Sequence, residues 1–138
     1  MEAQQKRKRV LFLCIGNICR SPMAEALARK YGSDVLEASS AGLSPGLNSH
    51  ATVRAILGEK NVELGAHVPR RIRDLDLRQF DLIVNISGEP LLATFGIPLE
   101  TWNVRDPFGG TEEEFRNARD ELEMLVMGLI LRIRTGKI

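Results

Sequence analysis

The chain has 138 residues, a size typical of one domain, and its hydrophobic (43%) and charged (27%) fractions are those of an ordinary globular protein. Its 19 basic residues nearly balance 18 acidic ones, so the net charge of +1 gives no reason to expect nucleic acid or another polyanion as a partner. We find no signal-peptide pattern, and no apolar run approaches the roughly twenty residues that cross a bilayer. We therefore expect a cytoplasmic protein without a membrane segment.

The predicted elements alternate between strand and helix. After a polar tail over residues 1–8, apolar periodicity and turn residues predict a single domain over 9–138. The second element, a helix, has Ser21 as its cap, Pro22 at its first position and Gly32 at its end. In chain order we predict a strand at 9–14, a helix at 21–32, a strand at 35–41, a helix at 49–60, strands at 81–86 and 100–104, and a helix at 112–134.

This alternation predicts an α/β fold with three layers, α/β/α, around a four-stranded parallel sheet of flavodoxin-like order 2-1-3-4. Ligands of such folds bind beyond the carboxyl ends of the strands, where Cys14 lies. Three apolar residues fall off the buried stripe of the last helix, and we favour core packing over a subunit contact for Met124, Met127 and Leu131. The expected state is a monomer or a weak dimer.

The loop between the first strand and the first helix carries the chemistry. Gly16 and Asn17 tolerate the backbone angles that turn successive N–H groups inward, and the helix behind them adds the positive end of its dipole. We expect these N–H groups and the planar guanidinium of Arg20 to bind a phosphoryl group. The same field favours the thiolate of Cys14, the candidate nucleophile, to which the Ser21 hydroxyl can donate. The predicted phosphate-binding residues are Ile15, Gly16, Asn17, Ile18, Cys19 and Arg20.

A zinc site is the alternative use of the two cysteines, Cys14 and Cys19. It would need two more ligands, and only His50 and His67 are available, which do not form a close pair. A redox switch formed by the thiols of Cys14 and Cys19 is a further alternative. No Lys follows a glycine in the loop, so this is not an ATP-type phosphate loop. We expect no metal and no cofactor.

Asp106 is the candidate proton donor for the group that leaves when sulfur attacks phosphorus. It precedes Pro107, and Phe108-Gly109-Gly110 makes the segment a mobile loop after a strand. By itself this sequence also signals an ordinary turn. The cysteine loop favours the catalytic interpretation.

Cys-x5-Arg-Ser after the first strand, continued by Pro22-Met23-Ala24-Glu25-Ala26, resembles the signature of the low-molecular-weight protein tyrosine phosphatases. Asp106-Pro107-Phe108 is similar to their general-acid motif, and residues 39–42 and 66–70 resemble two further family segments. The resemblance covers nearly all of the chain after residue 8. It implies a phosphocysteine intermediate on Cys14, which water hydrolyses while Asp106 switches from acid to base.

The resemblance also implies supporting roles around the loop. Asn17 would hold the strained backbone with His67 as a partner, Ser21 and Pro107 would support the reacting groups, and Cys19 would be a redox partner able to form a disulfide with Cys14. Ile18 and Phe108 would form the wall of the substrate site. The implied substrates are phosphorylated proteins or small aryl phosphates, with inorganic phosphate or a similar oxyanion bound in the loop.

Two related groups of enzymes share parts of this pattern. Gly46-Leu47-Asn48 and Trp102 are similar to the thioredoxin-coupled arsenate reductases, but Ser87 stands near the position of their first resolving cysteine. A reductase that relies on an external thiol is therefore the alternative enzyme. Bacterial arginine phosphatases resemble one another in having a Thr, which is smaller, where this chain has Ile18. The larger Ile18 would crowd a phosphoarginine and favours an aryl phosphate. A phosphate-dependent binding module without turnover would need neither a thiolate nor an acid.

Overall fold

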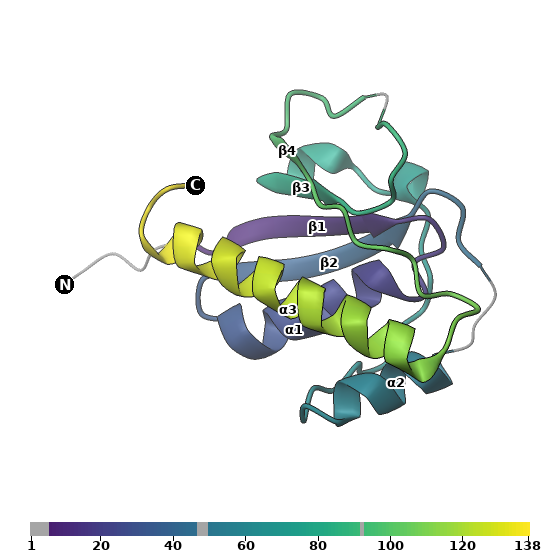
Figure 1. Cartoon of the computed structure of the whole chain (residues 1–138). Coiled ribbons are helices and arrows are strands. Elements are labelled where there is room, and N and C mark those ends of the chain that lie inside the picture. Colours follow the sequence, from purple (N-terminus) through teal and green to yellow (C-terminus); the bar gives the residue numbers. More distant parts are fainter. Residues whose placement is uncertain (1–5, 47–49, 92) are drawn as a thin grey trace.

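The computed structural model describes residues 6–46, 50–91 and 93–138. Four parallel strands form one sheet in the order β2-β1-β3-β4, which confirms the predicted fold class and strand order. Figure 1 shows the sheet with the long helix α3 crossing it. The elements are β1 (Lys8–Cys14), α1 (Arg20–Gly32), β2 (Leu36–Gly42), α2 (Ala51–Gly58), the short 3-10 helices η1 (Ile72–Asp74) and η2 (Leu77–Gln79), β3 (Leu82–Asn85), β4 (Leu99–Thr101) and α3 (Glu112–Arg134).

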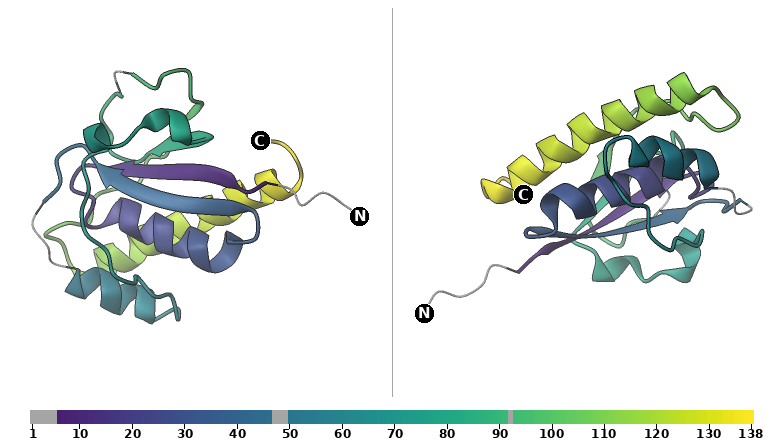
Figure 2. Two further views of the ribbon diagram at one scale, coloured as in Figure 1. Left: turned by 180° about the vertical axis from the view of Figure 1, so that it is seen from behind. Right: turned by 90° about the horizontal axis from the view of Figure 1, so that it is seen from below.

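The three α-helices cover one face of the sheet, and η1 and η2 cover the other (Figure 2). β1 is central and pairs with β2 and β3, so residues 10–14 are buried on both sides, as their continuous apolar run predicts. The larger apolar cluster lies under the helices, and the smaller one lies under the 3-10 helices. Among the described residues, no helix is both long and apolar enough to cross a membrane.

The first helix begins at Arg20, before its predicted start at Ser21-Pro22, and its predicted cap was wrong. α1 starts at Arg20, with Cys19 at the N-cap position and no side-chain cap. Ser21 lies inside the first turn, where its hydroxyl contacts Cys14 and Asn17 instead of a backbone N–H. Pro22 is still within that first turn, where its missing N–H removes no helical hydrogen bond. The N–H groups at this helix end are thus left for another partner.

Other boundaries moved by a few residues. α2 spans Ala51–Gly58 rather than 49–60, and Ser49 lies outside the described residues. β4 ends at Thr101 rather than at 104, because its only neighbour, β3, ends at Asn85. Trp102 N still donates to Asn85 O at 3.0 Å, and the chain then leaves the sheet.

The favoured interpretation of three residues on α3 was wrong. Met124, Met127 and Leu131 are 77%, 42% and 62% exposed, so they do not belong to the core. The buried stripe of α3 runs beside them and packs against α1 and α2. Gly32 at the end of α1 permits this packing, because a Cβ there would lie 2.7 Å from the side chain of Ile130.

Candidate active site

The loop between β1 and α1 turns its carbonyl groups outward. Three successive carbonyls accept hydrogen bonds from the segment that follows β2: Cys14 O from Leu43 N (3.1 Å), Ile15 O from Ser44 N (2.8 Å) and Gly16 O from Gly46 N (3.1 Å). No peptide bond among the described residues is cis, so each N–H lies opposite the carbonyl of its own peptide plane. The N–H groups of residues 15–17 therefore face the inside of the turn, where they can bind an anion.

Asn17 fixes the strained centre of this loop. Its φ of 53° lies in the left-handed region, and its side chain is fully buried. Nδ2 donates to Ser21 Oγ (2.9 Å) and Ser40 Oγ (3.0 Å), and Oδ1 accepts from Arg70 N (2.9 Å). Both hydrogens of Nδ2 and the oxygen Oδ1 are thus hydrogen-bonded, so the orientation of this buried amide is fixed. The amide in turn holds the backbone around Asn17 in place.

The end of β2 lies directly against the loop at Gly42. A Cβ at this position would lie 2.7 Å from Ile15 O and 2.9 Å from Asn17 N. Only glycine allows the strand and the loop to approach this closely.

Cys14 lies at the floor of the turn, only 3% exposed. Its Sγ is 2.9 Å from Ser21 Oγ, which already accepts a hydrogen bond from Asn17 Nδ2. The Ser21 hydroxyl hydrogen is therefore available to the sulfur, with Ala41 O at 3.4 Å as a weaker acceptor. A thiolate at this place would receive a hydrogen bond from below and lie at the positive end of α1.

Arg20 presents one edge of its guanidinium toward the turn. Nη1 donates to Ile86 O (2.6 Å) and Val104 O (3.0 Å). Nη2 lies 3.5 Å from Asp106 Oδ2, while Nε is buried and has no hydrogen-bond partner among the described residues. Buried polar groups are almost always paired, so a donor edge of this kind fits an oxyanion.

The loop of Asp106 closes the other side of the site. Its carboxylate is 44% exposed and accepts from Phe108 N at 3.1 Å, while Pro107 packs inward and Phe108 is 68% exposed. Thr111 then caps α3 by accepting from Glu114 N. The Asp106 carboxylate is thus held near Arg20 by a short turn anchored on a long helix.

A cleft of about 170 Å³ lies between the loop of residues 14–20, called the cradle from here on, and the loop of Asp106. Its walls combine sulfur, apolar side chains and one carboxylate: Cys14, Ile15, Gly16, Ile18, Cys19, Gly46, Asp106 and Phe108. Ile18 is only 7% exposed, since it lies beneath Gly46, where a Cβ would be 2.5 Å from Ile18 Cδ1. Phe108 is the more open of the two predicted wall residues.

Cys19 differs from Cys14 in its surroundings. Both are free thiols, but burial raises the pKa of Cys19 to about 12, with further contributions from the nearby Asp106 and Cys14. Cys19 therefore stays a protonated thiol at neutral pH. Of the two sulfurs, Cys14 is the one that contacts a hydrogen-bond donor.

His50 and His67 are close together, which corrects the expectation that they do not form a close pair. Their rings meet edge to face with centroids 5.0 Å apart, because α2 and the following segment return to the same side of the loop. His67 Nε2 lies 2.9 Å from Asn17 O, whereas His50 Nε2 is buried and unpaired within the described part of the chain. Leu47 and Asn48, which carried part of the likeness to arsenate reductases, lie outside the described residues.

The structure brings the predicted residues to one place, but sequence reasoning gave no role to several of their partners. Ser40 Oγ donates to Glu25 Oε1 at 2.6 Å, and the Arg70 guanidinium binds Ser40 O. Both Ser40 and Glu25 belong to segments that resemble the family, and a polar residue in a buried strand was the available signal. The carbonyls of Ile86 and Val104, which hold Arg20, have no side-chain signature at all.

The match to known proteins agrees with this geometry. The model of the family described as low molecular weight phosphotyrosine protein phosphatase matches residues 9–137. A protein-arginine-phosphatase of Geobacillus stearothermophilus is 35% identical over 92% of this chain and 97% of its own length. A glutaredoxin arsenate reductase of Synechocystis is 30% identical over 91% of this chain and 98% of its own.

Solved structures of similar fold include proteins named for the same two activities. An arsenate reductase in the phosphate binding state has a TM-score of 0.85 at 28% identity and covers 91% of this chain and 98% of its own. An arginine phosphatase from Geobacillus stearothermophilus has a TM-score of 0.82 at 28% identity and covers 94% and 95%. The chain therefore belongs to the low molecular weight phosphotyrosine protein phosphatase family.

Proposed function

We propose that the protein is a phosphomonoester hydrolase, most specifically a protein tyrosine phosphatase, whose catalytic domain spans residues 9–138. The observation that carries the proposal is the position of Cys14 Sγ. It lies 2.9 Å from a hydroxyl donor, at the floor of a turn with inward N–H groups. The same loop carries Arg20, whose buried Nε has no hydrogen-bond partner among the described residues. Such a site binds a phosphoryl group and places a nucleophile behind it.

In the first step the Cys14 thiolate attacks phosphorus and the bond from phosphorus to the ester oxygen breaks. The loop N–H groups and the Nε and Nη2 of Arg20 hold the three equatorial oxygens. The backbone donors proposed for this role belong to residues 15–20. Asp106, 3.5 Å from Arg20, donates a proton to the departing oxygen, so the alcohol or phenol leaves neutral.

In the second step water attacks the phosphocysteine. Asp106, now ionised, accepts a proton from that water, and the sulfur leaves as the thiolate with Ser21 as its hydrogen-bond donor. Phosphate is released and the starting state returns. Neither step needs a metal or a cofactor. The reaction does need a reduced Cys14, which fits the cytoplasm expected from the sequence.

The cleft supports an aryl phosphate as the substrate. Ile18 is covered by Gly46 and leaves little width at the loop's rim, while Phe108 offers an exposed ring beside the acid. A flat phenyl group can pack against Phe108 as it leaves toward Asp106. A phosphorylated tyrosine on a protein or a small aryl phosphate meets this description.

Arsenate reduction with an external thiol is the second candidate, because an arsenate would occupy the same cradle and curated relatives carry this activity. The chain has two cysteines in all, and neither lies after β3. Ser87, near the expected resolving position, is 6% exposed and bonds Asn85 and Glu89. An internal relay of sulfur through that segment is therefore absent.

The test uses purified protein with 4-nitrophenyl phosphate at about pH 6, beside Cys14→Ser and Asp106→Asn. We expect turnover by the parent, none by Cys14→Ser, and a loss of about a hundredfold or more in Asp106→Asn with phosphate binding preserved. Acid quenching should trap phosphate on Cys14. A parent without turnover that still binds a phosphopeptide would favour a binding module, and equal loss of phosphate binding in Asp106→Asn would make Asp106 structural.

Substrate preference needs three parallel assays. Peptides with phosphotyrosine and with phosphoarginine, matched in sequence, would separate the two phosphatase activities, and we expect faster cleavage of phosphotyrosine. Arsenate with glutathione, mycothiol or thioredoxin tests the reductase. Rapid arsenite formation with slow phosphate ester cleavage would reverse the order of the two candidates.

A further inference from the structure

The guanidinium of Arg20 is aimed by two backbone carbonyls that lie outside the cradle. Nη1 donates to Ile86 O at 2.6 Å and to Val104 O at 3.0 Å, so both of its hydrogens are used. The rigid planar group then has only the edge formed by Nε and Nη2 for an oxyanion. The direction of that edge is set by the orientation of the two carbonyls.

The carbonyl of Ile86 belongs to a peptide plane that is held at its other end as well. A trans peptide places the carbonyl and the following N–H on opposite sides of one rigid plane. Ser87 N, in the same plane as Ile86 O, donates to Asn85 Oδ1 at 3.0 Å. One end of this plane thus binds Arg20, and the other end binds the side chain of Asn85.

The amide of Asn85 is itself fixed. Nδ2 donates to Glu89 O at 2.7 Å, and Oδ1 also accepts from Ser87 Oγ at 2.6 Å. Asn85 is only 4% exposed and ends a strand that otherwise reads Leu-Ile-Val. A buried Asn is disfavoured in such a strand, and a departure of this kind from local preference usually has a functional reason.

We propose that Asn85 is a positioning residue for phosphoryl transfer. Through the Ile86–Ser87 peptide it fixes the angle at which Arg20 offers Nε and Nη2 to the equatorial oxygens. This inference rests on the proposed function. The phosphoryl group becomes planar in the transition state, so a misaligned fork weakens transition-state binding more than substrate binding. Loss of the Asn85 side chain therefore lowers kcat and leaves KM nearly unchanged.

The experiment is a double-mutant cycle of Asn85→Ala and Arg20→Lys, since Lys lacks the planar fork whose angle Asn85 sets. kcat and KM are measured with 4-nitrophenyl phosphate, and vanadate and phosphate affinities are measured by calorimetry. In the parent background Asn85→Ala should lower kcat and vanadate affinity by about tenfold to a hundredfold, with a smaller effect on phosphate. In the Arg20→Lys background Asn85→Ala should change kcat and vanadate affinity by less than about twofold each.

The control is Ile83→Val, which removes one methylene from the same strand at a fully buried position away from this peptide. It should lower the melting temperature and keep kcat per folded molecule. If Asn85→Ala does not fold, Ser87→Ala removes the hydroxyl that donates to Oδ1 and accepts from Glu89 N, while the bond from Ser87 N to Oδ1 remains. It should lower kcat about twofold to tenfold, again only when Arg20 is present.

The two proposals fail in different ways. Equal losses in both Arg20 backgrounds, or an unchanged kcat per folded molecule in Asn85→Ala, would overturn the role of Asn85 while the phosphatase activity stands. A parent without turnover would overturn the proposed function. The vanadate affinities of the same cycle would then still test the role of Asn85. If Asn85→Ala weakens vanadate binding only when Arg20 is present, the positioning role is supported, and if it weakens binding equally in both backgrounds, that role is contradicted.

Discussion

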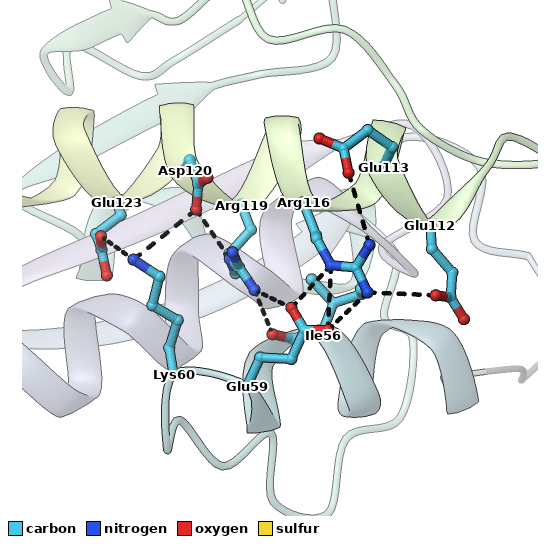
Figure 3. Close-up of polar contacts among 9 residues, drawn as sticks. All are labelled: Ile56, Glu59, Lys60, Glu112, Glu113, Arg116, Arg119, Asp120 and Glu123. Carbon is cyan, nitrogen blue, oxygen red and sulfur yellow. Dashed lines mark hydrogen bonds and ion pairs between the residues drawn. The ribbon is translucent and has the colours of Figure 1, made fainter.

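Two polar networks hold this molecule together at different places, and they differ in burial. The cradle network links Cys14 through Ser21, Asn17 and Ser40 to Glu25, and most of its members are fully buried. The interhelix ion cluster joins α2 to α3 around Glu59, largely at the surface (Figure 3). A buried donor left without its partner costs more than a broken surface ion pair. The cradle network therefore fixes a geometry, and the ion cluster adds modest stability.

The largest expected effect comes from Asn17→Ala. The change removes three hydrogen bonds and places Ala at a φ of 53°. Each buried group left unpaired costs about 1–3 kcal/mol, and the left-handed backbone costs Ala about 1–2 kcal/mol more. We expect a loss of several kcal/mol in urea unfolding and of about a hundredfold or more in kcat.

Asn17→Gly is the matched control, because glycine adopts this backbone without strain. It should recover about 1–2 kcal/mol of the stability lost by the Ala variant and little of its activity. Equal activity of the Gly variant and the parent would show that the backbone, and not the amide, shapes the loop.

The second prediction compares two glycines. Gly42→Ala pushes a methyl group against Ile15 O and Asn17 N, at 2.7 and 2.9 Å, so it should cost about 1–3 kcal/mol and lower kcat more than tenfold. Gly128→Ala lies at an exposed position in α3, with no atom within 4 Å of the new Cβ. It should add about 0.5–1 kcal/mol and leave kcat unchanged. Thermal melts and the ester assay check both, and a Gly42→Ala enzyme with normal kcat would contradict the close approach.

The surroundings of Cys14 and Arg20 show which parts of the site are predictable from the sequence. The strand–loop–helix around Cys14 was predictable, because strand residues, a loop Gly and Asn, and Arg-Ser-Pro follow one another locally. The start of α1 was not, since a Ser before a Pro is normally a cap and here its hydroxyl serves the thiol. The carbonyls that hold Arg20 come from residues 86 and 104, and backbone groups leave no trace in residue type.

The remaining misses have the same origin in tertiary contacts. Met124 and its neighbours on α3 are apolar, but the helix turns them outward, because the stripe beside them already fills the space against α1. His50 and His67 are far apart in sequence and meet only because the chain returns to the loop. Local sequence patterns predict helices and strands well, and they predict contacts between distant segments poorly.

The third prediction concerns His50, whose ring packs against His67, the residue that contacts Asn17 O. Burial lowers its pKa below the usual 6.5, and the positive charges of His67 and Arg54 lower it further. Above about pH 6.5 the side chain is neutral in both states and contributes no pH dependence. Below that value the unfolded chain binds a proton that the folded protein resists, so stability falls by at most about 1.4 kcal/mol per pH unit.

His50→Phe keeps a ring against His67 and removes this titration. Urea unfolding at several values between about pH 7 and pH 5 should show the parent losing more stability than the variant. The comparison isolates His50, since His67 is present in both proteins. Parallel stability curves would contradict a proton-resisting His50.

The smallest effect is expected in the ion cluster, where Glu59 binds Arg116 and Arg119 (Figure 3). These arginines lower the pKa of Glu59 to about 2, so the carboxylate stays ionised in the folded protein after its unfolded counterpart has been protonated. Its contribution is complete above about pH 4.5 and disappears as the pH falls toward 2. Glu59→Gln should therefore lower the melting temperature slightly at neutral pH, with a difference that shrinks in acid and in high salt.

The kcat of Glu59→Gln at about pH 6 should not change, because the cluster lies between α2 and α3 and makes no contact with the cradle within the described part of the chain. A loss of kcat in Glu59→Gln at unchanged stability would mean that the two networks are coupled, and the distinction between a geometric and a stabilising role would no longer hold.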